Sequence, residues 1–118
     1  MRYVLEISGF HPTLLNAMLR KHWRVVSRLK NADTQRIVVE CRTQRIPKAT
    51  GKRRVILTWV MAPRNKPIDA DAPWKNLLDG LVAAGALKDD TLEWCELVGP
   101  ILERGAVKGI RVELEDVG

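Results

Sequence analysis

The chain has 118 residues, of which 46% are apolar and 29% charged, which is enough for one domain with a hydrophobic core and too few for two. This composition excludes a disordered or fibrous chain. No apolar run is long enough to span a bilayer, so we expect a cytoplasmic protein without a membrane partner. The net charge of +6 is unevenly divided: residues 1–68 carry 15 Lys and Arg against 3 Asp and Glu (+12), and residues 69–118 carry 5 against 11 (−6). This asymmetry suggests a polyanionic partner for the first half, although an unevenly charged solvated surface explains it equally well.

The first 43 residues predict a strand and a long helix. Residues 2–7 alternate apolar and polar side chains, as strands do. From about Asn16 to Thr43 there is no proline or glycine, and apolar residues recur with helical spacing: Leu19, Trp23, Val26, Leu29, Ile37 and Cys41. The opposite face is basic, with Arg20, Lys21, Arg24, Arg28 and Lys30. We expect one long basic helix, with any break near residues 31–33, that either lies along phosphates or faces solvent.

The rest of the chain predicts a central strand followed by an acidic helix. Ile46–Lys52 contains proline and glycine and predicts a basic loop, and Arg53–Met61 is apolar on both faces, as a central strand is. A helix is expected over residues 72–84, with Asp71 as its N-cap. Two further strands are expected over residues 91–98 and 107–115, with Gly99-Pro100 between them.

The predicted fold class is therefore α/β, of the mixed α+β kind, in a single small domain over residues 1–118. We expect a mixed sheet of about four strands, the long basic helix, and a second helix that carries the acidic motif. Cys41 and Cys95 lack CxxC spacing, and His11 and His22 lie in separate contexts, so we expect buried thiols, no zinc site and no organic cofactor.

The stretch from Asp69 to Asp90 gathers five carboxylates and Lys75 in 22 residues of an otherwise basic chain. Asp69 and Asp71 are two residues apart, so in an extended segment both side chains point the same way and can share one cation. Asp71, Lys75 and Asp79 follow at helical spacing, and Asp89-Asp90 could return a third carboxylate to the same point. Hard cations such as magnesium favour this kind of ligand, and a bound magnesium ion would relieve the repulsion among the acids.

Each of these residues also has an ordinary structural explanation. Asp71 can be a helix cap, Lys75 and Asp79 a surface ion pair, and Asp89-Asp90 turn residues. These explanations suit single residues better than the whole set, because capping explains neither Asp69 nor the second acidic pair. A phosphoacceptor aspartate domain or a nucleotide-sugar enzyme with a DxD motif is a further alternative, and the lack of a glycine-rich phosphate cradle disfavours it.

The motif resembles that of the RusA-like endodeoxyribonucleases, a family that includes Holliday junction resolvases and is common in phages and prophages. The family pattern of D-x-D-N, Lys, Asp-x-Leu and Asp-Asp appears as Asp69-Ala70-Asp71-Ala72, Lys75, Asp79-Gly80-Leu81 and Asp89-Asp90. One position departs from it, because Ala72 stands where the family usually has asparagine. The direct match covers about 22 residues.

The resemblance implies a homodimer that nicks branched DNA, such as a four-way junction, with Mg²⁺ or substituting Mn²⁺. Carried over by position, the catalytic residues are Asp69, Asp71, Lys75 and Asp90, of which the three aspartates are the metal ligands; Asp79 and Asp89 are supporting residues. The DNA contacts that we expect from the basic half are Arg20, Lys21, Arg24, Arg28, Lys48, Lys52, Arg53, Arg64 and Lys66. The alternative is a junction-binding protein that has lost cleavage, as the change at Ala72 would allow.

Overall fold

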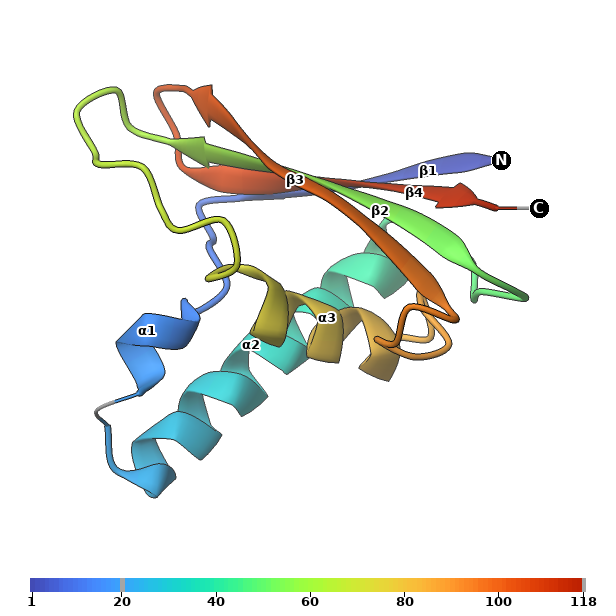
Figure 1. The fold of residues 1–118 in the computed structure, drawn as a ribbon, viewed down its shortest axis with the longest axis horizontal. Helices are drawn as coiled ribbons and strands as arrows, with labels where there is room; N and C mark the ends of the chain where they lie inside the picture. The colour runs from blue at the N-terminus through green and yellow to red at the C-terminus, as the bar shows by residue number, and fades with distance from the viewer. Residues whose placement is uncertain (20, 118) are drawn as a thin grey trace.

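The computed structural model describes residues 1–19 and 21–117 and contains one mixed sheet with helices on one of its faces (Figure 1). Its elements in chain order are β1 (Arg2–Ser8), α1 (Leu15–Met18), α2 (Trp23–Thr43), β2 (Arg53–Met61), α3 (Trp74–Ala83), β3 (Cys95–Arg104) and β4 (Gly109–Asp116). The predicted single domain with a mixed four-stranded sheet is confirmed. None of the helices in these described ranges is long and apolar enough to cross a membrane.

The sheet has the strand order β1-β4-β2-β3. β4 is antiparallel to both of its neighbours, and Val112 lies opposite Leu5 on one side and Leu57 on the other. β2 and β3 are parallel, as expected for two strands joined through the intervening α3. The two outer strands, β1 and β3, each leave one edge unpaired within the described residues.

The hydrophobic core lies between the sheet and the helices. Alternate residues of β1, β2 and β4 point to this side and are buried, among them Leu5, Leu57 and Val112. α3 contributes Trp74, Leu77, Leu78 and Leu81, and α2 contributes Ile37 and Cys41. Because both long helices lie below the sheet in Figure 1, its other face is open and carries most of the charged strand residues.

Several predicted boundaries are wrong, since the strand expected over residues 91–98 is Cys95–Arg104, and two of the errors have a local reason. The helical stretch of the first half is interrupted between Met18 and Trp23 rather than near residues 31–33, because His22 is extended and caps α2 by accepting a bond from the Arg24 amide. β3 continues through Gly99-Pro100 instead of ending there. The register of β2 and β3 shifts between Ile56 and Thr58. Proline, which has no N–H, is tolerated in an edge strand because no further strand pairs with that edge.

α3 packs closely on α2 at Gly80. A Cβ placed on Gly80 would lie 2.6 Å from Cδ1 and 2.9 Å from Cβ of Ile37. The Cβ of Ile37 is fixed to its own backbone, so a side chain at residue 80 would force the two helices apart. Glycine is therefore needed here for space rather than for an unusual backbone angle.

We expect Gly80→Ala to lower the free energy of unfolding by up to about 2 kcal/mol. Overpacking costs about 1–3 kcal/mol, and the gain of alanine over glycine in a helix offsets roughly 1 kcal/mol of that cost. Thermal unfolding followed by circular dichroism measures the change. Gly51→Ala is the matched control, because nothing lies within 4 Å of a Cβ at Gly51. A higher melting temperature for Gly80→Ala would contradict this account of the helix contact.

Candidate functional site

The first acidic pair lies in the segment that leads from β2 into α3. Asp69 and Asp71 are both exposed, and the chain turns between them as the Ala72 amide donates to the Asp69 carbonyl at 3.1 Å. The Ala72 carbonyl in turn accepts from the Leu15 amide at 3.0 Å, and the Ala72 side chain is buried. Backbone bonds thus anchor this segment to α1 and leave both carboxylates in solvent.

The expected capping role of Asp71 is wrong. α3 begins at Trp74 rather than at residue 72, its N-cap residue is Pro73, and no side chain makes a capping bond. Pro73 suits this place because an N–H at a helix start has no partner within the helix, so its absence in proline costs little. The ordinary explanation for Asp71 therefore does not hold.

Lys75 and Asp79 lie on the exposed side of α3, one turn apart. Nζ of Lys75 is 3.5 Å from Oδ1 of Asp79, which makes the pair expected from the spacing. With about half of the lysine side chain exposed, such a pair contributes only a few tenths of a kcal/mol. Lys75 is therefore held weakly, and an anion placed nearby could draw its ammonium away from Asp79.

The second acidic pair follows α3 and precedes β3. Asp89 and Asp90 are exposed, and the Asp90 amide donates to Oδ1 of Asp89 at 2.8 Å, as in a turn. Both lie close enough to Cys95, the first residue of β3, to add to the effect of burial in raising the pKa of its thiol. The turn role that we considered for Asp89 is thus present, and the carboxylate of Asp90 stays in solvent.

The structure places the acids at both ends of α3 and does not gather them. A helix of 10 residues spans about 15 Å, with Asp69 and Asp71 before it and Asp90 after it. Within residues 1–19 and 21–117, no three Asp, Glu, His or Cys side chains form a group that could hold a metal ion. Magnesium, however, commonly keeps several waters and takes only one or two protein carboxylates. The pair Asp69 and Asp71 fits that requirement in donor type and exposure.

A buried polar contact that the sequence reasoning missed holds α3 in position. Asp33, in the middle of α2, accepts from Nδ2 of Asn76 at 2.8 Å and from the Thr13 amide at 2.6 Å. Asn76 is only 1% exposed and lies next to Lys75, and its Oδ1 has no partner among the described residues. The available signal was an aspartate in the apolar stripe of a helix, four residues after Leu29 and four before Ile37.

The expected DNA-binding cations lie on three separate parts of the surface. Arg24 and Arg28 are exposed in the first turns of α2 and Lys21 just before it. Lys48 and Lys52 belong to the loop before β2, and Arg64 and Lys66 are exposed in the loop that leads to Asp69. Arg20 lies outside the described residues. Only the pair Arg64 and Lys66 is close in sequence to the first acids.

Arg53 does not fit the predicted role of a DNA contact. It is 2% exposed, and its guanidinium donates to Asp116 at 2.9 Å and to the carbonyls of Pro47 and Ala86 at 2.8 and 2.9 Å. It also lies over the ring of Tyr3, 5.0 Å from the ring centroid. Arg53 thus joins β2 to β4, to the loop before β2 and to the segment after α3.

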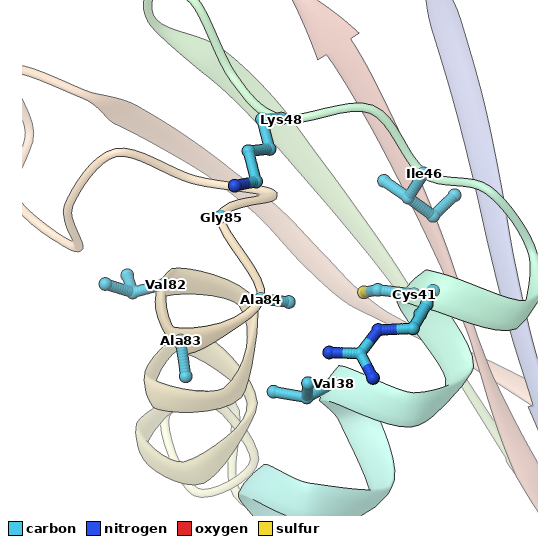
Figure 2. Close-up of a pocket in the computed structure, with 9 residues that line it drawn as sticks. Val38, Cys41, Ile46, Lys48, Val82, Ala83, Ala84 and Gly85 are labelled. Atoms are coloured by element: carbon cyan, nitrogen blue, oxygen red, sulfur yellow. The ribbon is translucent and has the colours of Figure 1, made fainter.

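A recess of about 480 Å³ separates the end of α2 from the end of α3 (Figure 2). In this view the sulfur of Cys41 points toward Ala84, and Lys48 lies across Gly85. Burial raises the pKa of the Cys41 thiol to about 11, with a smaller contribution from Glu40. The thiol therefore stays protonated near neutral pH and is not a nucleophile.

Comparison with known proteins gives no assignment: no family model matches the chain, and no curated protein matches it.

We expect Arg53→Met to lower the free energy of unfolding by at least about 2 kcal/mol, because Asp116, the part-buried carbonyl of Pro47 and the buried carbonyl of Ala86 would each lose a charged donor. Urea unfolding measures this. Arg54→Met is the control, since Arg54 is a partly exposed neighbour whose ion pairs contribute little. Equal stability of the two variants would show that the buried contacts of Arg53 are unimportant.

We expect Cys41 to resist alkylation by iodoacetamide at pH 8. With a pKa of about 11, only roughly a thousandth of the thiol is ionised at that pH, and the side chain is also buried. Mass spectrometry should show modification of Cys41 at least tenfold slower in the native protein than in guanidinium chloride. The native rate should rise with pH up to about 11, and rapid labelling at pH 8 would contradict the burial of this thiol.

Proposed function

We propose that this protein is a magnesium-dependent, structure-selective DNA endonuclease of the RusA-like kind, which resolves Holliday junctions or related branched DNA by paired nicks. One observation carries the proposal: Asp69, Asp71, Lys75 and Asp90 are all exposed, whereas the residues between them on α3 are mostly buried. The apolar residues of this segment are thus buried in the core, and the four charged residues are accessible to a substrate.

The residues before α3 have the chemistry that phosphodiester hydrolysis requires. Asp69 and Asp71 would hold the metal ion, together with water and substrate oxygens. When bound, magnesium polarises a phosphoryl oxygen and favours hydroxide as the nucleophile. Lys75 would leave its weak pair with Asp79 and neutralise charge on the scissile phosphate or the leaving oxygen.

The exposed cations beside the motif suit the DNA backbone. Arg64 and Lys66 precede Asp69 by only a few residues, so they would hold phosphates that flank the cleaved bond. The cations of α2 would bind the same substrate farther away. Asp90 joins this site only if the loop after α3 moves or another chain supplies it, because no group of three acids forms within the described residues.

A homodimer is part of this proposal, since a two-fold protein can present two sites to a roughly two-fold junction. The edge strand β3 supports it, because four apolar side chains of that strand are between 37% and 48% exposed: Leu97, Val98, Ile101 and Leu102. Apolar surface of this kind on an unpaired edge is typical of a contact with another chain.

The second candidate is a junction-binding protein without cleavage. The separation of Asp90 from Asp69 and Asp71 favours it, as does Ala72, whose buried methyl group offers the carboxylates no hydrogen bond. This candidate keeps the cations and the salt-dependent affinity for DNA but has no metal-dependent chemistry.

We expect the purified protein to nick a synthetic four-way junction in magnesium, and Asp69→Asn, Asp71→Asn and Asp90→Asn each to lower the rate at least about 100-fold, as loss of a strong electrostatic contribution does. Junction binding should survive in all three variants, because none removes a cation. Single-turnover cleavage on denaturing gels and gel-shift titrations measure the two properties.

Glu93→Gln is the matched control, because Glu93 is an exposed acid three residues after Asp90 that lies outside the motif. Its cleavage rate should equal that of the native protein. Junction binding without cleavage in either magnesium or manganese would instead establish the second candidate. Cleavage that persists in Asp69→Asn and Asp71→Asn would exclude this site.

A further inference from the structure

Trp23, the first residue of α2, is on the surface although its spacing in the sequence predicts a core residue. The side chain is 66% exposed, and Leu19, one turn earlier in the sequence, is 72% exposed. Figure 1 shows why: the first turns of α2 extend past α3 and away from the sheet, so neither element covers the apolar stripe at this end of the helix. The indole ring therefore has no role in the core.

The surroundings of Trp23 are cationic and polar. The guanidinium carbon of Arg24 lies 5.3 Å from the centroid of the indole, and the ring of His22 lies 5.6 Å away at a tilt of 32°. A shallow recess of about 550 Å³ runs from the indole along α2, and five of its seven lining residues have polar side chains: Trp23, Arg24, Ser27, Arg28, Asn31, Ala32 and Gln35. Aromatic, cationic and amide groups thus share one surface.

No carboxylate belongs to this part of the chain. Between Glu6 and Asp33 the sequence contains five Lys and Arg and no Asp or Glu. Asp33 itself is buried and bonded to Asn76. The surface around Trp23 therefore attracts a polyanion, and no acid of its own helix turn competes for the cations.

We propose that Trp23 is a stacking site for an unpaired nucleic-acid base, with Arg24 and Arg28 on the adjoining phosphates. This subsite rests on the DNA-binding activity proposed above and specifies which part of a branched substrate it takes: a base freed from pairing. Bases stack on exposed aromatic rings whatever their sequence, and a neighbouring arginine adds to the attraction. Asn31 and Gln35 offer hydrogen bonds to the edges of the stacked base.

A second copy of the chain fits this surface poorly. In a two-fold contact the same patch meets itself, so Arg24 and Arg28 would face the same cations of the partner, with no acid between residues 7 and 32 to pair with them. A bilayer fits poorly as well, because a helix lying in a membrane interface needs a continuous apolar face, whereas Ser27, Asn31 and Gln35 line the recess beside the indole.

The test compares native protein with Trp23→Ala and Trp23→Phe, using oligothymidylate that contains one 2-aminopurine, together with the same sequence as a duplex. We expect Trp23→Ala to weaken single-strand binding roughly 5- to 150-fold and to abolish the quenching of 2-aminopurine fluorescence that stacking causes. Trp23→Phe should keep most of both. Duplex affinity should change less than about twofold, because paired bases cannot stack on the ring. Trp94→Phe is the control, since Trp94 also has a cation, Lys88, over its ring at 5.3 Å.

Equal single-strand affinity in Trp23→Ala and native protein overturns the proposal. So does an equal loss for single strand and duplex, which would make Trp23 a general contact. Two further results overturn it, because each would give this surface another occupant. The first is a dimer of the native protein that dissociates in Trp23→Ala, measured by sedimentation velocity. The second is binding to anionic vesicles that requires Trp23, together with single-strand binding that does not. Quenching that needs Trp23 in a protein that never cuts DNA would support the stacking site and reject the nuclease.

Discussion

The contact of α3 with α2 is the constraint on which the rest of the molecule depends. α3 carries Lys75 and Asp79, and the two acidic pairs adjoin its ends. The packing of Gly80 on Ile37 sets the distance of α3 from α2, and the buried hydrogen bond between Asn76 and Asp33 sets the position of α3. The first contact is steric and requires the absence of a side chain, whereas the second is a hydrogen bond away from water, where an unpaired carboxylate would be costly. Together they place the charged side of α3 in solvent and its apolar side on the sheet.

Part of the opposite charge of the two halves of the sequence is paired between strands of the sheet. Arg2 and Arg54 both pair with Glu115, and Arg53 pairs with Asp116, so strands of the basic half are joined to β4 of the acidic half. Hydrogen bonds from the two arginines hold the pKa of the Glu115 carboxyl below its usual value, which favours the paired state down to more acidic pH. Among the described residues, no ion pair involves the cations at the beginning of α2. Most of the cations that make no ion pair within the described residues therefore lie on α2 and in the loops.

Periodicity and turn chemistry predicted the elements well, and most of the errors have one kind of cause. The sheet, its mixed character and the acidic helix follow from local patterns in β2, α3 and β4. The exposure of Trp23 and the burial of Arg53 do not, because each depends on which other elements lie beside that residue in space. A helical stripe predicts which side of α2 is apolar but not how far the sheet and α3 extend along it. The sequence predicted which acidic residues form the motif and that a helix lies between the two acidic pairs. It did not predict the separation of Asp90 from Asp69, since that depends on the path of the chain after α3.

The passage of β3 through Gly99-Pro100 limits how copies of the molecule can associate. A strand added to that edge would meet a proline without an N–H at the middle of the strand, so an uninterrupted ladder of backbone hydrogen bonds cannot form. The exposed apolar side chains of β3 can still be covered, but only by packing against other side chains. Any association at this edge would therefore rest on side-chain packing, whereas a continuous edge would permit the open-ended strand addition that leads to fibres.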